Sequence, residues 1–264
     1  SDVCSSDLPV GAFKLHERLS LAAGPTFNYS YLKLQNGIGF LPNDELRFKG
    51  DDWDYGFNAG LLWRPHDKWS IGLNYRSATS LNHRGKSEQY PYSAERGTSA
   101  RVDFPQIVSG GVSFRPTPKW NFEVDVDWTD WDTLDAITFD GAINPLTGRD
   151  IIFPLQWQSS WFHHAGATRY LPRGYFVSAG YFFSENSTTE RYFNPIVPDT
   201  DLHVGSLGGG YKGKHWDWAI AGQIITGPWR DISTTQTTSL VGETANGRYR
   251  FFVPAVTVSL GYHF

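Results

Sequence analysis

The last twelve residues of the chain, VPAVTVSLGYHF (253–264), alternate in polarity from Val256 onward. The apolar residues occupy every second position (Val256, Val258, Leu260, Tyr262 and Phe264), and the residues between them are small or polar (Thr257, Ser259, Gly261 and His263). Successive side chains of a β-strand point to opposite faces, so this stretch predicts a strand with one apolar and one polar face. Such a strand needs either a second sheet or lipid against its apolar face.

The same alternation recurs along the chain. It is clearest in 19–31, 53–63, 69–76, 122–128 and 175–183, where aromatic residues stand near the ends of the apolar rows. The pattern is weaker in 156–170, where His163 and His164 interrupt it, and in the glycine-rich 201–211. We count about ten full strands and a short strand at 9–15. Their lengths match the roughly 9–11 residues that a tilted strand needs to cross a bilayer.

Short polar turns and longer polar stretches separate these runs in regular order. The short turns are LHER (15–18), RPHDK (64–68), RPTPK (115–119), LPRG (171–174) and YKGKH (211–215), and the longer stretches are roughly 34–51, 81–100, 140–155, 184–200 and 228–247. Short turns on one side and long loops on the other are typical of outer-membrane barrels.

The composition limits the alternatives. Aromatic residues make up 16% of the 264 residues, and a net charge of −4 gives no basic surface for nucleic acid. No apolar run reaches the roughly 18 residues of a transmembrane helix. The mean hydropathy of −0.39 does not exclude a membrane barrel, whose strands are apolar on one face only. Cys4 is the only cysteine, so an intrachain disulfide is excluded.

These observations predict an all-β protein, a transmembrane antiparallel β-barrel whose many strands cross the outer membrane of a Gram-negative bacterium. A barrel satisfies all backbone groups and leaves no open edge in lipid. The alternative is a secreted β protein. By alternation, the lumen-facing residues are Asn58, Asn74, Glu123, Asp125 and Asp127.

Three segments resemble the FadL-type family of long-chain fatty acid and aromatic-hydrocarbon transporters. They are GDDWDYGFNAGLLWRPHDKWSIGLNYRS (50–77), FPQIVSGGVSFRPTPKWNFEVDVDWTDWDTL (104–134) and GYFVSAGYFFSENSTTERYFNPIVPDTDLHVGSLGGGY (174–211). They include a Tyr-Arg-Ser step at 75–77, a Trp-Thr-x-Trp step at 128–131 and a Pro-Asp-x-Asp step at 198–201. The similarity runs from about residue 9 to the end.

The resemblance implies a barrel of fourteen strands with an N-terminal hatch in its lumen. Residues 9–264 then correspond to the C-terminal two-thirds of such a barrel, without the hatch. The first eight residues, SDVCSSDL, match nothing that follows, and we interpret them as a non-native leader; an ordinary disordered tail is the alternative. The final strand, ending in Phe264, looks like the signal read by the outer-membrane assembly machinery.

The resemblance also implies where a ligand enters. In the family, an apolar groove between the third and fourth outer loops receives the ligand, and by order these loops are 34–50 and 81–100. The groove candidates are Ile38, Phe40, Leu41 and Phe48. Arg76, which faces inward by alternation, is a candidate partner for a ligand carboxylate. In the alternative interpretation, Arg76 pairs with a lumenal acid such as Asp125 or Asp127.

The resulting functional prediction is passage of hydrophobic small molecules across the outer membrane by facilitated diffusion, with no cofactor, no metal and no enzymatic activity. The expected partners are the hydrophobic ligand, outer-membrane lipid and lipopolysaccharide, and the assembly machinery, with no nucleic acid. A general porin for polar solutes is the nearer alternative. A barrel hydrolase is the other, built on His163, His164 or His203 with a serine such as Ser159 or Ser160.

Two acidic groups have two interpretations each. The row Glu123, Asp125 and Asp127 is either a catalytic set or, as we expect, wall charges paired with arginines on neighbouring strands. Asp199 and Asp201 either hold a divalent cation or, as we expect, cap a turn.

Overall fold

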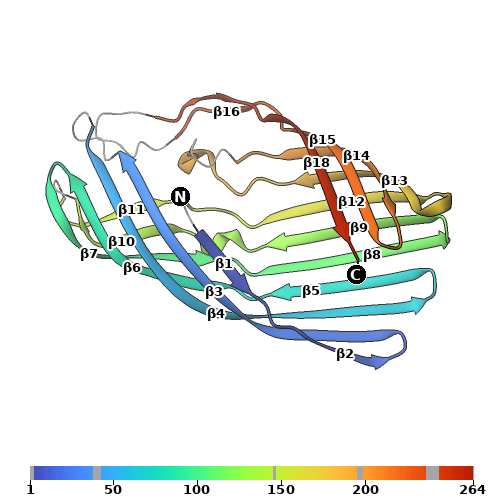
Figure 1. Cartoon of the computed structure of the whole chain (residues 1–264). Helices are drawn as coiled ribbons and strands as arrows, with labels where there is room; N and C mark the ends of the chain where they lie inside the picture. Colours follow the sequence, from blue (N-terminus) through green and yellow to red (C-terminus); the bar gives the residue numbers. More distant parts are fainter. Residues whose placement is uncertain (1–2, 38–42, 145–146, 195–198, 236–243, 264) are drawn as a thin grey trace.

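The structure, a computed structural model, describes residues 3–37, 43–144, 147–194, 199–235 and 244–263. Within these ranges, sixteen strands form one antiparallel sheet that curls around a central space, as Figure 1 shows. Nearly every strand pairs with its neighbour in sequence, so the sheet is a succession of hairpins.

Ten of these strands make up the wall of the sheet: β3 (Leu19–Gly37), β4 (Glu45–His66), β5 (Trp69–Arg76), β8 (Ile107–Thr117), β9 (Trp120–Thr129), β12 (Ser160–Tyr170), β13 (Tyr175–Ser184), β14 (Leu202–Lys212), β15 (Trp216–Thr226) and β18 (Phe252–Tyr262). The predicted ten strands are confirmed, including the two with weak patterns. The short strand expected at 9–15 is β2 (Gly11–His16), which pairs with β3.

The glycine-rich pattern of β14 has a packing cause. Gly210 lies opposite Phe176 on one side and Ala219 on the other. A Cβ at Gly210 would collide with the carbonyl oxygen of Trp218 and with the ring of Phe176. This stretch is therefore poor in side chains because its neighbours occupy the space, and it remains a regular strand.

Both ends of the sheet are open in the part of the chain that the structure describes. At one end, β1 (Val3–Asp7) and β2 both pair with β3; at the other, β18 pairs only with β15. Strand β1 lies within the segment that we interpret as a non-native leader. Its pairing does not test that interpretation, which stays a prediction.

Four strands continue the sheet beyond the wall, on the side of the long connections. They are β6 (Thr79–Tyr90), β7 (Ser93–Phe104), β10 (Ala136–Ile143) and β11 (Asp150–Pro154), in the order β4-β6-β7-β10-β11. The prediction of irregular loops at 81–100 and 140–155 is therefore wrong. Strand β6 pairs in register with the outer half of β4, and β7, β10 and β11 follow it in turn, so this pairing extends the sheet in a way that their own polar sequence does not reveal.

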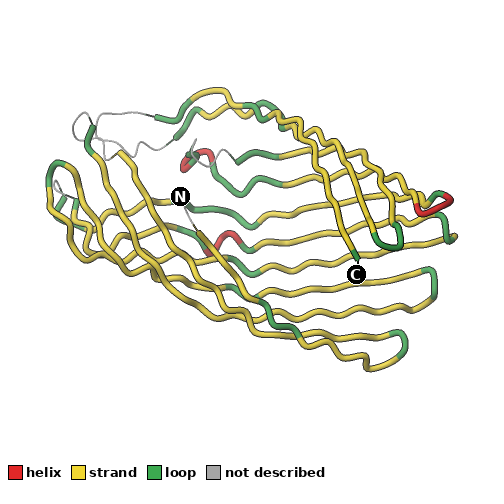
Figure 2. The backbone as a smooth tube through the Cα atoms, in the orientation of Figure 1, coloured by secondary structure: helices red, strands yellow, loops and turns green. Residues whose placement is uncertain are grey.

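The remaining elements are short. Strands β16 (Arg230–Ile232) and β17 (Gly247–Tyr249) form a separate two-stranded sheet. Three single-turn helices, Trp131–Thr133, Pro172–Gly174 and Glu190–Tyr192, lie between strands in the described residues (Figure 2). None of the described helices is long and apolar enough to cross a membrane.

Strand β4 changes partner part-way along its length. Its residues 45–51 pair with β6 and its residues 58–66 pair with β5. Between them, the Asp52 carboxylate accepts the backbone N–H of Asn82 at 2.7 Å and the Asp54 carboxylate accepts that of Ser80 at 2.5 Å. Two aspartate side chains therefore replace the missing backbone bonds along this seam between β4 and β6.

Candidate functional site

The outer face of the wall carries a continuous band of exposed apolar side chains. On β18, Val256, Val258 and Leu260 are each at least 70% exposed, and on β14 Leu207 is 72% exposed. Soluble monomers rarely expose a contiguous apolar surface beyond a few hundred Å². A sheet with this outer face requires an apolar solvent, which supports the membrane-barrel prediction.

Aromatic residues stand at the margins of this band. Trp53 and Trp63 on β4 delimit eleven residues whose outward side chains are all apolar or aromatic. Trp69 stacks on Phe114 with ring centroids 4.3 Å apart, and Tyr29 lies 4.9 Å from Trp53. Aromatic girdles of this kind mark the two interfaces of an outer-membrane barrel.

The inner face of the wall is polar and hollowed. A concave pocket of about 500 Å³ lies against β5, β8, β9 and β12. Four of the predicted lumen-facing residues line it (Asn74, Glu123, Asp125 and Asp127) together with His164. The fifth, Asn58, is half-buried on β4, and its side-chain nitrogen has no hydrogen-bond partner among the described residues.

The three carboxylates of β9 are not paired with arginines in the described structure. Asp127 receives a hydrogen bond from His164 at 2.9 Å, and Glu123 receives one from the side chain of Asn121 at 2.7 Å. Glycine faces Asp125 across β8, and a Cβ at Gly111 would collide with its carboxylate. The expected arginine partners are therefore absent from the described residues, and His164 is the residue that sequence reasoning did not place here.

The sequence does contain a signal for His164, although the pair His163 and His164 first looks like an interruption of the apolar row. In the register of β12 with β9, His164 lies opposite Asp125 and points inward, whereas His163 lies opposite Val126 and points outward. The ring of His164 also stacks on Phe182, with centroids 4.7 Å apart. Consecutive histidines on a strand must face opposite sides, so one of the two belongs to the lumen.

The serines considered for a hydrolase are engaged elsewhere. Ser159 donates to the carboxylate of Asp130 at 3.2 Å, and Ser160 accepts a hydrogen bond from Ser187 at 2.9 Å. Nucleophilic catalysis requires the base within hydrogen-bond reach of its nucleophile. No such pair involving His164 forms in the described part of the chain.

Arg76 lies at the end of β5, exposed on the inner side. One of its terminal nitrogens donates to Ser6 Oγ at 3.3 Å and to Asn28 Oδ1 at 3.5 Å. Both partners are neutral, and within the described residues Arg76 forms no ion pair with Asp125 or Asp127. Its charge is therefore not neutralised by the lumenal row.

Of the four groove candidates, only Phe48 lies among the residues that the structure describes. Ile38, Phe40 and Leu41 fall in 38–42, outside the described residues. Phe48 lies on the outer half of β4 and is 2% exposed. It packs in an apolar cluster with Leu46, Ala100, Phe139, Ala142 and Ile151, joined at its edge by Leu32 and Leu34 of β3.

This apolar cluster lies on the inward side of the sheet. Phe48 and Leu46 continue the same inward row of β4 that holds Asn58 and Asp54 further down. Leu34, opposite Phe48 on β3, continues the row of Asn28 and Thr26. The inner face therefore changes from polar to apolar as these strands leave the lipid-facing band.

The outward face changes from apolar to polar along the same strands. Beyond Trp53, toward the connection between β3 and β4, the outward residues of β4 are Asp51, Lys49, Arg47 and Glu45. Arg47 pairs with Glu45 at 2.7 Å, and this contact holds the pKa of Glu45 below its usual value. In each strand of the β3–β4 hairpin, the half far from the connection between them (the lower half, 19–31 and 53–66) is apolar on its outward face. The half next to that connection (the upper half, 32–37 and 45–51) is apolar on its inward face.

Asp199 and Asp201 bond to backbone N–H groups. Asp199 accepts from the N–H groups of Ser187 and Thr188, and Asp201 accepts from the backbone and side chain of Asn186. These bonds tie 199–201 to residues 186–188, 11 to 15 positions earlier, and are therefore structural contacts between two segments, not the local turn caps that we expected. Burial raises the pKa of Asp199 above its ordinary value, against the opposing effect of these bonds. The described residues contain no cluster of three or more His, Cys, Asp or Glu suited to a metal ion.

Comparison with known proteins identifies the family to which the chain belongs. The sequence model of the family described as outer membrane protein transport protein (OMPP1/FadL/TodX) matches residues 4–262. The chain belongs to this family. Its members are outer-membrane proteins, and the exposed apolar band of the OMPP1/FadL/TodX fold is the surface that meets lipid.

The relatives are distant in sequence. The chain is 20% identical over 209 residues to the long-chain fatty acid transport protein of Escherichia coli O6:H1, covering 70% of this chain and 46% of that protein. It is 27% identical over 184 residues to a 47 kDa outer membrane protein of Pasteurella multocida, covering 63% and 42%. The chain thus spans less than half the length of these relatives.

Solved structures share the fold. A FadL homologue of Pseudomonas aeruginosa superposes with a TM-score of 0.78 at 20% identity, covering 98% of this chain and 67% of that one. The toluene transporter TodX of Pseudomonas putida gives a TM-score of 0.69 at 14% identity, covering 100% and 70%. The predicted transmembrane β-barrel fold of the FadL type is confirmed.

Proposed function

We propose that this barrel passes hydrophobic small molecules, of the long-chain fatty acid or aromatic-hydrocarbon class, across the outer membrane by facilitated diffusion. The observation that carries the proposal is the family match over residues 4–262. Relatives named for fatty acid and toluene transport support the two substrate classes.

The inverted polarity of the β3–β4 hairpin supports the proposal physically. The apolar cluster around Phe48 faces inward beyond the polar lumen, and in sequence Ile38, Phe40 and Leu41 fall between β3 and β4, the two strands that contribute Leu34 and Phe48 to it. An alkyl chain gains about 0.8 kcal/mol for each CH₂ that it buries in such surroundings. We assign these four residues to the region that first receives the ligand.

Arg76 is assigned to a ligand carboxylate. Its partners in the structure are neutral, and an unpaired buried carboxylate is costly, so a fatty acid needs such a cation. An aromatic hydrocarbon has no charge to satisfy. Substitution Arg76→Gln should reduce fatty acid uptake several-fold and leave alkylbenzene uptake unchanged, which makes the second substrate an internal control.

Uptake by whole cells tests the transport proposal. Deletion of the protein should lower accumulation of radiolabelled fatty acid or alkylbenzene, and restoration of the protein should recover it. Unchanged uptake of both in the deletion strain would refute the proposal.

The polar lumen wall is the observation that favours the porin alternative. The three carboxylates of β9 line a pocket of about 500 Å³ and form no ion pair with an arginine among the described residues. Such a pocket would suit hydrated cations. Planar-bilayer recordings discriminate between the two functions. A large, steady, cation-selective conductance would support the porin, whereas a small conductance together with hydrophobic uptake supports the transporter.

A further inference from the structure

The charges of the chain are divided unequally between the two ends of the sheet. Eight lysines and arginines and only two acids, Glu17 and Asp67, fall in the short turns, a net of six positive charges. The rest of the chain carries a net of ten negative charges, because the whole chain stands at −4. We call these turns the basic rim; they lie at the same end of the sheet in Figure 1 and comprise 15–18, 64–68, 115–119, 171–174 and 211–215.

The positive excess does not depend on the exact limits of the turns. Adding two residues on either side of each turn brings in Lys14, Arg169 and Asp217, and the net rises to seven. A terminal carboxylate at Phe264 lowers it again by one. The basic rim therefore stays strongly positive however it is delimited.

The cations of the basic rim are exposed, and acids of the protein meet few of them. All eight side chains are exposed to solvent. Arg18 contacts Asp67 at 3.6 Å, which is the one ion pair within the rim as the structure describes it. The side chains of Lys68, Lys119 and Arg173 form no hydrogen bond or ion pair with other described residues. These cations are available to an anion outside the protein.

Backbone hydrogen bonds hold neighbouring turns of the rim side by side. The N–H of Arg64 donates to the carbonyl oxygen of Arg18 at 2.8 Å, and the N–H of Arg115 donates to that of Lys68 at 2.8 Å. Cations of adjacent turns are thereby kept near one another, and like charges repel. A layer of negative charge against the rim would relieve this repulsion.

The basic rim borders the aromatic margin of the lipid-facing band. Arg64 directly follows Trp63, and Lys68 directly precedes Trp69. The two tryptophans are 46% and 41% exposed. Interfacial tryptophans lie at the level of the lipid headgroups, and long basic side chains beside them reach the same level. The rim is therefore placed where headgroup phosphates meet the barrel.

Arg169 shows the position that such a side chain takes. It lies on the outward face of β12, opposite Trp120 of β9, and its guanidinium carbon is 5.4 Å from the centroid of the tryptophan ring. A guanidinium over an interfacial ring keeps its charge at the headgroup level and leaves N–H donors for an outside acceptor.

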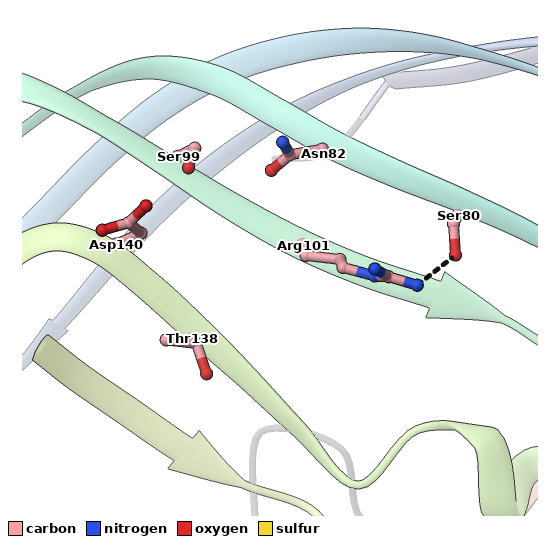
Figure 3. A pocket seen from close by; sticks show the side chains of 6 residues that line it. All are labelled: Ser80, Asn82, Ser99, Arg101, Thr138 and Asp140. Atoms are coloured by element: carbon pink, nitrogen blue, oxygen red, sulfur yellow. Dashed lines mark hydrogen bonds between the residues drawn. The ribbon is translucent and has the colours of Figure 1, made fainter.

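Several cations at the opposite end of the sheet are instead met by acids of the protein. Lys86 contacts Glu95 at 2.9 Å. Arg101 contacts Asp103 at 2.9 Å, and Figure 3 shows its guanidinium turned toward Ser80. The longer polar stretches between the strand pairs contain eight basic and twelve acidic residues. The positive excess therefore belongs to the short-turn end.

We propose that the basic rim binds anionic phospholipids of the periplasmic leaflet, of the phosphatidylglycerol or cardiolipin type. The short turns of an outer-membrane barrel lie on the periplasmic side, so a headgroup phosphodiester is the anion at this level. Lysines and arginines of adjacent turns donate charge-assisted hydrogen bonds to its oxygens, and the acyl chains lie against the apolar band. This interaction is separate from the path of the transported molecule.

Lipid binding to the purified full chain in detergent, measured by native mass spectrometry, tests the proposal. Cardiolipin should bind about tenfold more tightly than phosphatidylcholine. One cation near an anionic lipid surface changes affinity by about fivefold, so Lys68→Ala with Lys119→Ala should abolish most of this preference. Rising ionic strength should weaken the preference in the same direction.

Two matched variants serve as controls. Arg84→Ala with Arg96→Ala removes two exposed cations from the opposite end of the sheet and should leave the preference unchanged. Lys68→Arg with Lys119→Arg retains the charge and should also retain it. A preference for cardiolipin that survives the double alanine variant of the rim, or that the control at the opposite end also loses, would overturn the proposal.

Further measurements separate this interaction from other roles of the rim. Equal affinity for cardiolipin and phosphatidylcholine, together with binding of polyglutamate that the rim variant loses, would assign the rim to an acidic protein and overturn the lipid proposal. Alkylbenzene uptake should remain normal in the rim variant, so the result does not depend on the transport proposal. Heat-modifiable migration on gels checks folding; where the rim variant fails to fold, Arg64→Ala with Lys214→Ala provides the same test.

Discussion

The two halves of the β3–β4 hairpin are built on the same two strands with opposite arrangements of polarity. In the lower half, Phe57 and Trp53 face outward and are more than half exposed, while Asn58 faces inward. In the upper half, Phe48 faces inward and is 2% exposed, while Lys49 faces outward. β4, at 22 residues and about 3.3 Å per residue, is about 70 Å long, more than twice the thickness of a bilayer core. The solvent outside the barrel, lipid or water, decides which face is apolar.

The largest expected difference between the halves comes from two phenylalanines on β4. Phe48→Ala leaves a cavity in the apolar cluster and should lower the free energy of unfolding by about 3–5 kcal/mol. Phe57→Ala removes a ring that is 52% exposed and should cost no more than about half as much. Urea unfolding in lipid vesicles, followed by tryptophan fluorescence, measures both. Equal losses would contradict the assignment of one to a packed core and the other to lipid.

Introducing a charge distinguishes lipid from water directly. Leu73 on β5 and Ile152 on β11 are both aliphatic, outward and about half exposed, at 53% and 56%. Leu73→Arg should destabilise the barrel by about 2–4 kcal/mol because it places a guanidinium in hydrocarbon. Ile152→Arg should change stability by less than about 0.5 kcal/mol because its surroundings are aqueous. Similar costs at the two positions would place both halves in the same solvent.

The seam between the halves is expected to depend on its two carboxylates. Asp54→Ala removes the acceptor for the Ser80 N–H and should cost about 1.5–3 kcal/mol, the range for hydrogen bonds to charged groups. Hydrogen exchange should accelerate at Ser80 and remain unchanged at Asn82, whose acceptor is Asp52. The reverse pattern should follow Asp52→Ala. Protection that survives both substitutions would show that the seam is held by other contacts.

The smallest expected effect is a difference in pH dependence between two acids outside the membrane. Burial raises the pKa of Asp199, so its contribution to stability is full at acid pH and is lost as the pH rises above its ordinary pKa of 3.8. Arg47 and Gln35 lower the pKa of Glu45, so its contribution is lost as the pH falls below about 4.5. Asp199→Asn and Glu45→Gln should therefore change the slope of stability against pH, between pH 3 and 6, in opposite directions. Slopes changed in the same direction would contradict this pair of assignments.

The sequence alone predicts the lower half well and the upper half poorly. The alternation in 53–63 and 69–76 reports a strand between lipid and a polar lumen, and both strands are found there. In 81–90 the inward residues are Leu81, His83, Gly85, Ser87 and Gln89, which give no apolar row although four of the five are buried. Their pairing is imposed by β4 through long-range contacts, and a local pattern does not contain that information.

The candidate site is likewise only partly predictable from the sequence. Alternation places Asn74 and the β9 carboxylates on the inner face, because facing direction follows from period alone. The partners of those groups depend on the register between strands: His164 meets Asp127, and Arg76 meets Ser6 and Asn28. Register is set by the whole sheet, so these pairs could not be read from spacing.

The apolar cluster around Phe48 has a consequence for how the chain crosses the membrane. Its members lie on β3, β4, β7, β10 and β11, so the cluster is complete only when the outer parts of all five strands have reached the far side of the membrane. Its burial free energy is unavailable while any of them is still in transit. Because burial of its apolar surface is favourable, formation of this cluster is expected to oppose return of the hairpins across the membrane.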